Sequence, residues 1–114
     1  MAERLLLLEE GHCLRDQALS LCHAAGAAEA DDFRASSLAT VVQMVVNGYG
    51  ATILPDLALP VEAGANPRLR VVRFRQPVPM RTIGLAWRAS SPRAADFAAF
   101  GELVKAAHHE VTAA

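Results

Sequence analysis

The four leucines at positions 5 to 8 constrain the fold of this chain more than any other feature of its sequence. Charged residues bound the run on both sides, and Gly11 follows shortly after it. An apolar run of this length, with no polar alternation, is typical of a strand that is buried on both faces. Such strands occur in parallel sheets that helices cover on both sides.

Two helices are expected after this strand. In the first, apolar side chains recur every three or four residues from Leu14 to Ala25, and Gly26 stands at the C-terminal stop. A short extended piece at residues 33–35 leads to a second helix at residues 38–47, which Ser36 or Ser37 can cap. The apolar stripe of the second helix consists of Leu38, Val41, Val42, Val45 and Val46.

The second half of the chain predicts three further strands and a last helix. The stretch GATILPD at residues 50–56 reads as a third buried strand, followed by one helical turn at 57–59 and a loop at 61–67. Residues 69–74 and 82–88 are strand-like. Ser91 and Pro92 precede a long C-terminal helix. This order predicts an α/β domain with a mostly parallel sheet flanked by helices.

Length and charge narrow the class of protein. The chain has 114 residues, enough for one domain, with 11 Lys and Arg against 12 Asp and Glu. Such a balance gives no broad basic surface for nucleic acid or anionic lipid. The leucine run is too short for a signal peptide or a membrane span, so we expect a cytoplasmic protein without membrane contact.

Both cysteines of the chain lie in the first expected helix, and each has a histidine beside it. If this helix begins at Gly11 or His12, Cys13 lies in its first turn, where unpaired N–H groups and the helix dipole favour an anion such as a thiolate. His12 and Arg15 add to this effect, and Asp16 opposes it. Cys13 is therefore the candidate reactive sulfur.

Cys22 lies nine residues after Cys13. In a regular helix this separation gives a rise of roughly 13 Å and half a turn of phase difference. A disulfide needs Cα atoms within about 7 Å, so the two sulfurs can bond only if the helix unwinds. In the entropic model, closing such a loop limits the unfolded chain by about 2.5 to 3 kcal/mol, and the helix that would be lost is short and marginal by itself. The segment between the sulfurs is thus a candidate two-state element.

Other interpretations of the cysteines remain open at this point. Two cysteines in an alanine-rich helix are often small apolar core residues. A zinc site formed by His12, Cys13, Cys22 and His23 is disfavoured because nine residues of helix spread the ligands too widely. No CxxC motif supports a thioredoxin-type dithiol. A thiol peroxidase would use the same nucleophile, but no docking surface for a reductant is evident.

Three stretches of the sequence resemble one branch of a known family. LLLLEEGHCLRDQALSLC, FRASSLATVVQMVVNGYGATILP and RTIGLAWR are similar to the C-terminal part of the regulatory domain of the peroxide-sensing LysR-type transcriptional regulators. The resemblance implies a fold like that of periplasmic binding proteins. Residues 1–90 would be part of the second regulatory subdomain, and residues 91–114 would be the helix that packs on the first subdomain. The DNA-binding module and most of the first subdomain are expected to lie outside this chain.

The resemblance also implies roles for individual residues. Cys13 would react with hydrogen peroxide, and Cys22 would resolve the product into a Cys13–Cys22 disulfide. His12 and Arg15 would position peroxide and hold the thiolate, while Arg81 would correspond to a strand arginine that faces the reactive thiol.

The same resemblance implies partners. The helix from Leu38 to Asn47 would lie at a homodimer interface, and DNA would be bound only through a helix-turn-helix absent from this chain. The expected function is redox sensing in transcription regulation, not catalysis, with no cofactor and no metal. The alternative is a small-molecule-binding subdomain of the same architecture with incidental cysteines, its ligand lying near Ser36 and Ser37.

Overall fold

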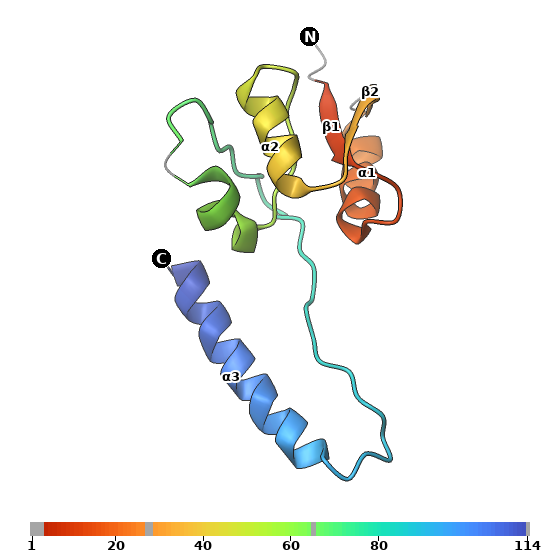
Figure 1. Cartoon of the computed structure of the whole chain (residues 1–114), viewed down its shortest axis with the longest axis vertical. Helices are drawn as coiled ribbons and strands as arrows, with labels where there is room; N and C mark the ends of the chain where they lie inside the picture. Colours follow the sequence, from red (N-terminus) through yellow and green to blue (C-terminus); the bar gives the residue numbers. More distant parts are fainter. Residues whose placement is uncertain (1–3, 27–28, 65, 114) are drawn as a thin grey trace. The chain divides into compact units, whose positions relative to one another are not determined.

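The computed structural model describes residues 4–26, 29–64 and 66–113, and it falls into two units that divide between Arg73 and Phe74. The first unit contains β1 (Leu5–Leu8), α1 (Cys13–Ala25), β2 (Glu29–Ala35) and α2 (Leu38–Val46), followed by a 3-10 turn at Asp56–Ala58 and a π turn at Leu59–Ala63 (Figure 1). The second unit contains α3 (Ala94–Ala113).

β1 is the central strand of the first unit. It pairs in parallel with β2, with Leu7 opposite Arg34 and Leu8 opposite Ala35. On its other edge, Leu5 forms a parallel bridge with Ala51, and the amide of Leu6 donates to the Ala51 carbonyl at 2.8 Å. Gly50 is required for this close approach, because a Cβ at that position would collide with the carbonyl oxygen of Arg4.

Successive leucines of β1 point to opposite faces of the sheet, as side chains of a strand must. Leu6 and Leu8 pack with Ala35 and Val41 on the side of α2. Leu5 and Leu7 pack on the other side, with two small residues of α1. Figure 1 shows β1 between these two helices. The predicted strand buried on both faces, and with it the predicted α/β class, is confirmed.

The helix boundaries follow from local capping. α1 begins after His12 and ends at Gly26, whose φ of 67° is the left-handed conformation that glycine adopts most easily. α2 begins after Ser37, whose hydroxyl accepts a hydrogen bond from the Thr40 amide at 3.3 Å. Of the two serines that could cap this helix, Ser37 does so. α2 ends at Asn47, as the sequence predicts.

Three predictions for the second half of the chain are wrong or incomplete. In the described part of the chain, residues 69–74 and 82–88 form no strand, and the stretch 50–56 forms one bridge instead of a full strand. A strand needs a neighbour that pairs with its backbone groups, and sequence pattern alone cannot supply one. The predicted helical turn at 57–59 is also too short, because helical structure continues through Pro60 to Ala63. A proline is tolerated in the first turn of a helix, where its missing N–H would have no partner within the helix.

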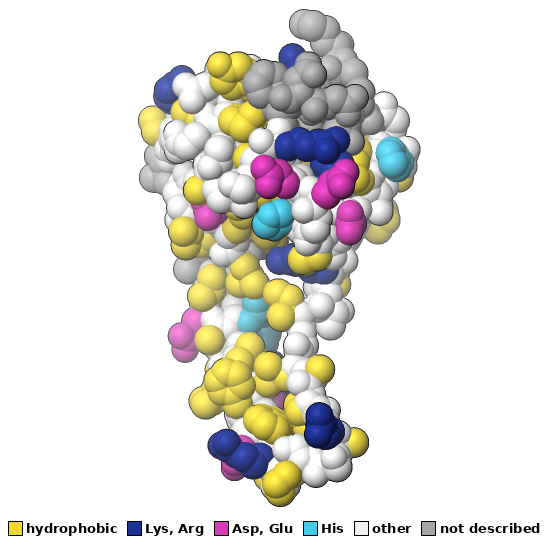
Figure 2. Space-filling model, turned by 45° about the vertical axis from the view of Figure 1, so that its right-hand side comes forward, with side chains coloured by type: hydrophobic (Ala, Val, Ile, Leu, Met, Phe, Trp, Pro, Cys, Tyr) yellow, Lys and Arg dark blue, Asp and Glu magenta, His cyan; other side chains and the backbone are white. Residues whose placement is uncertain are grey.

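The second unit consists of extended chain followed by α3. Trp87 and Phe97 lie with ring centroids 5.8 Å apart, and Arg93 pairs with Asp96 at the start of the helix. Many large apolar side chains of this unit are exposed, and Figure 2 shows them in yellow. They include Phe74, Met80, Ile83, Phe100 and Leu103. No helix in the described ranges has both the length and the apolar character to cross a bilayer.

Candidate functional site

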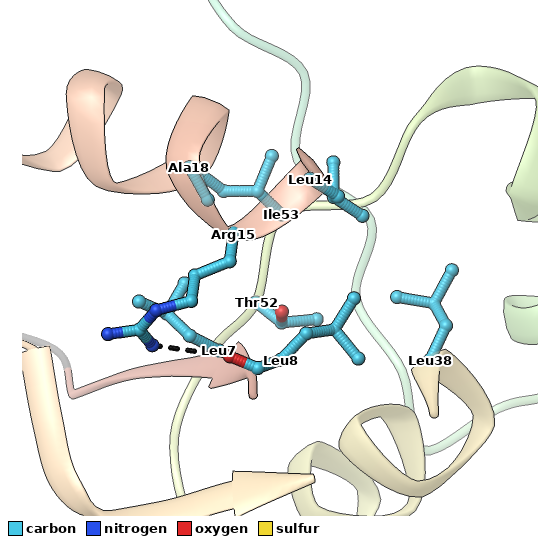
Figure 3. Close-up of a pocket in the computed structure, with 8 residues that line it drawn as sticks. All are labelled: Leu7, Leu8, Leu14, Arg15, Ala18, Leu38, Thr52 and Ile53. Atoms are coloured by element: carbon cyan, nitrogen blue, oxygen red, sulfur yellow. Dashed lines mark hydrogen bonds between the residues drawn. The ribbon is translucent and has the colours of Figure 1, made fainter. Parts of the chain in front are cut away.

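The candidate site lies where β1 and β2 end and the two helices of the first unit begin. In parallel sheets this carboxyl edge is where ligands and reactive groups gather. Leu14 and Leu38, from the first turns of α1 and α2, line the same small hollow there (Figure 3). Thr52 and Ile53 line it from the neighbouring segment. The first turn of α1, which carries Cys13, therefore starts at this edge.

Cys13 is the first residue of α1, and it is exposed. His12 is the N-cap, with φ of −88° and ψ of 121°, but its side chain makes no capping hydrogen bond in the described structure. Cys13 thus lies at the N-terminal end of the helix, where the helix dipole is positive and the N-cap side chain does not cover the N–H groups. Asp16, the acidic residue of this turn, opposes that positive field. The sulfur lies at a position that a small oxidant can reach.

Cys22 has a different environment. It is 5% exposed and packs with Leu5, Leu7 and Ala18 in the core between α1 and β1. The interpretation of the cysteines as small apolar core residues therefore describes the packing of Cys22, whereas Cys13 is outside the core. The two sulfurs are not bonded to each other, so this structure represents the dithiol form.

Arg15 is buried, with 7% of its surface exposed. Its Nη1 donates a hydrogen bond of 3.2 Å to the carbonyl oxygen of Leu8, the last residue of β1 (Figure 3). The sequence predicts Arg15 near the thiol and does not predict this contact with the strand. Its spacing does place Arg15 on the helix face that contacts β1, because it lies three residues before Ala18 and seven before Cys22.

The remaining candidate residues are spread over the chain. Arg81 is exposed and belongs to the second unit, so its proposed position opposite Cys13 stays a prediction. Ser36 and Ser37 lie at the start of α2, and Ser37 is engaged in capping. Within residues 4–26, 29–64 and 66–113, no three His, Cys, Asp or Glu side chains gather to bind a metal ion.

The hollow beside Arg15 offers little room for an organic ligand. Its empty volume is about 210 Å³, and this figure includes space open to solvent. Pockets that bind organic ligands usually have about 300 to 1,000 Å³. Most of its lining is aliphatic, and the polar groups there are Arg15 and Thr52, whose hydroxyl donates to the Leu6 carbonyl at 2.9 Å. The site therefore suits a small reactant better than a larger metabolite.

Comparison with known proteins gives one consistent result. The family model described as LysR substrate binding domain matches residues 1–108. The probable hydrogen peroxide-inducible genes activator of Mycobacterium avium is 50% identical over 109 residues, which are 91% of this chain and 35% of that protein. The DNA-binding transcriptional dual regulator OxyR of Escherichia coli (strain K12) is 45% identical over 104 residues, 91% of this chain and 34% of that protein.

Two solved structures agree with these relatives. The structure of a mutant of Corynebacterium glutamicum OxyR superposes on this chain with a TM-score of 0.83 and 43% sequence identity. The match covers 96% of this chain and 34% of the OxyR chain. A second mutant of that protein, described as H2O2-bound, gives a TM-score of 0.82 and 44% identity over the same shares. The chain thus spans about one third of the length of these proteins. The resemblance found in the sequence is confirmed.

Proposed function

The chain belongs to the LysR substrate-binding domain family, and we propose that it is the redox-sensing part of the regulatory domain of a hydrogen-peroxide-responsive transcriptional regulator. Relatives named as hydrogen peroxide-inducible activators and a relative with H2O2 bound support peroxide as the signal. The observation that carries the proposal is the placement of the two sulfurs. Cys13 is exposed at the N-terminus of α1, and Cys22 is buried near the other end of the same helix.

In the first step, the thiolate of Cys13 attacks one oxygen of hydrogen peroxide. An S–O bond forms and the O–O bond breaks, so that Cys13 becomes a sulfenic acid and hydroxide leaves. Peroxide is the oxidant and gains the two electrons that the sulfur loses. The exposure of Cys13 provides access for peroxide, and the sulfur lies at the N-terminal end of α1, where the helix dipole is positive.

In the second step, the sulfur of Cys22 attacks the sulfenic sulfur of Cys13. An S–S bond forms, the S–O bond breaks, and water leaves with the thiol proton of Cys22. Because the two sulfurs are separated by about 13 Å of helical rise, this step requires α1 to unwind. The oxidised form therefore differs in shape from the dithiol form described above.

The cost of this rearrangement is distributed over the core. Unwinding α1 weakens the contacts that Ala18 and Cys22 make with Leu5 and Leu7 of the central strand. Formation of the S–S bond at the expense of peroxide offsets this loss. Two arrangements of similar free energy are what a switch needs.

His12, Arg15 and Arg81 complete the proposed site. His12 precedes the reactive sulfur and is exposed, so its ring can reach a peroxide molecule at Cys13. Arg15 supplies positive charge to the same helical turn, and we assign Arg81 to the site from the resemblance to the peroxide-sensing regulators alone. We assign residues 1–90 to the second regulatory subdomain and residues 91–114 to a helix that packs on the first subdomain. The exposed Phe100 and Leu103 of α3 support an additional packing partner for that helix.

The output of the switch would be a change at a dimer contact. α2 packs on β1 opposite α1, and its partly buried Met44 and Val45 border the core cluster that includes Leu8. A rearrangement of α1 therefore acts on the strand that supports α2, which we propose as the homodimer surface. DNA contact is assigned to a helix-turn-helix outside these 114 residues, in keeping with a net charge of −1. The proposed role is regulation in the cytoplasm, not turnover of peroxide.

Peptide mapping of the oxidised protein tests this proposal. The reduced chain is treated with one to two equivalents of hydrogen peroxide, free thiols are alkylated, and the digest is examined by mass spectrometry. We expect the peptides that contain Cys13 and Cys22 to be joined, with the mass of two hydrogen atoms lost. Reduction with dithiothreitol should separate them. A sulfonic acid at Cys13, or unchanged thiols, would contradict the proposal.

The second candidate is a small-molecule-binding subdomain in which the cysteines are incidental. The observation in its favour is the start of α2 beside Ser36 and Ser37, a helix N-terminus that suits an anion. Calorimetry with small carboxylates distinguishes the two functions, because a Cys13→Ala variant should bind such a ligand as the native chain does. Heat of binding that survives this substitution, without any peroxide-induced disulfide, would favour this candidate.

A further inference from the structure

We propose that Arg15 is a positioning residue that sets the balance between the dithiol and disulfide forms. Its hydrogen bond to Leu8 holds the first turn of α1 on the end of β1, and disulfide formation would break this bond. This inference rests on the proposed redox function. It gives Arg15 a role at the strand that is separate from stabilising the thiolate of Cys13.

The contact has features that make its loss costly. The guanidinium is buried, and it donates to the Leu8 carbonyl at 3.2 Å. Leu8 is also buried and pairs with Ala35 in the parallel sheet. If Arg15 leaves, a carbonyl in a buried position loses its charged donor, and a buried acceptor without a partner is strongly unfavourable. The contact therefore stabilises the form in which the first turn of α1 is intact.

Disulfide formation must move one of the two cysteines by several ångströms. Cys22 is held in the core by Leu5, Leu7 and Ala18, whereas Cys13 is exposed and follows Gly11, whose φ is 92°. The end of α1 that carries Cys13 therefore has fewer contacts to lose. Arg15 lies two residues from Cys13, so it has to leave Leu8 when that turn moves. In the described structure two contacts of the first turn oppose the movement: this buried hydrogen bond and the packing of Leu14 on the core cluster that includes Leu8.

A structural residue that stabilised both forms equally would not change their ratio, but a contact present in one form must change it. A hydrogen bond with a charged donor affects an equilibrium by about ten- to a hundredfold. We therefore expect Arg15→Met to raise the ratio of disulfide to dithiol by about this factor at a fixed redox buffer. For a two-electron couple, a tenfold change corresponds to about 30 mV.

The experiment equilibrates the full chain with graded ratios of reduced and oxidised glutathione. After acid quenching and alkylation, mass spectrometry gives the ratio of dithiol to disulfide. Arg15→Lys keeps one positive donor and should give a smaller shift than Arg15→Met. It also carries the test if the methionine variant does not fold. Arg73→Met is the matched control, because Arg73 forms an exposed ion pair with Asp56 at 2.9 Å in the same unit.

The outcomes separate the two levels of the proposal. An Arg15→Met or Arg15→Lys ratio equal to that of Arg73→Met would overturn the role of Arg15 while leaving the redox function in place. A shift toward the dithiol would overturn it as well. If the native chain forms no Cys13–Cys22 disulfide at any glutathione ratio, the proposed function fails and the inference fails with it.

Discussion

Cys13 and Cys22 occupy opposite ends of one helix, the first exposed to solvent and the second packed against Leu5 and Leu7 of the central strand. Their different burial gives them different chemistry. In the proposed reaction, an oxidant in solution meets the exposed Cys13 sulfur first, and the buried Cys22 reacts after the helix has opened. The order of the two proposed steps therefore follows from where the helix places each sulfur.

Replacing the buried cysteine should stop the reaction at its first stage. In Cys22→Ser, we expect peroxide to convert Cys13 to a sulfenic acid that a dimedone reagent traps, with no internal crosslink. The matched control is Cys13→Ser, in which the remaining thiol is buried and should resist modest peroxide. Mass spectrometry of the intact chain reports both. A Cys13 thiol that stays unmodified in the peroxide-treated Cys22→Ser variant would contradict this order.

Oxidation should remove helix from one place in the chain. Because Cys13 and Cys22 span nearly the whole of α1, we expect far-ultraviolet circular dichroism to lose signal equivalent to about one helix of this length. Hydrogen exchange should quicken in α1 and stay slow at Val41 and Val42 of α2, which are buried. Identical exchange patterns for the reduced and oxidised chains would exclude a change of shape.

The central strand should be the most sensitive part of the first unit. Leu6 has no exposed surface, so Leu6→Ala should lower the free energy of unfolding by about 2 to 5 kcal/mol. Val61 is 83% exposed, and Val61→Ala should change it by less than about 0.5 kcal/mol. Urea unfolding under reducing conditions measures both. Similar losses in the two variants would mean that β1 is not the centre of the core.

Two adjacent serines provide a test of the cap of α2. The Ser37 hydroxyl accepts from the Thr40 amide, so Ser37→Ala should cost about 1 kcal/mol of stability. Ser36→Ala is the matched control and should cost much less, because Ser36 precedes the N-cap position. Thermal unfolding of the two variants decides the matter. If Ser36→Ala lost more stability than Ser37→Ala, Ser37 would not be the cap of α2.

Local signals in the sequence predict the first unit well as far as the end of α2. The leucine run requires cover on both faces, and Gly26 and Asn47 mark where the helices end, so β1, α1 and α2 could be placed from the residues alone. The segments 69–74 and 82–88 have strand composition but pair with nothing in the described chain. Whether such residues become a strand depends on a distant partner, which local composition does not reveal.

The candidate site was predictable to a similar degree. Cys13 stands in the first turn of α1, as its distance from Gly11 suggests. The contact of Arg15 with Leu8 was not foreseen, because a charged residue is ordinarily expected at the surface and its partner is a backbone carbonyl. Every residue has a backbone carbonyl, so the sequence does not show which one accepts a hydrogen bond from a side chain. Only the fold brings the end of β1 and this side chain together.

Gly11 and Gly26 bracket α1, and both have positive φ, at 92° and 67°. Glycine passes between backbone regions that other residues cannot share, so each position can serve as a hinge. These two hinges let the sixteen residues 11–26 change their backbone conformation without a break in the chain on either side. The effect on the rest of the first unit then passes through side-chain packing, from α1 to Leu5 and Leu7 and from the other face of β1 to α2.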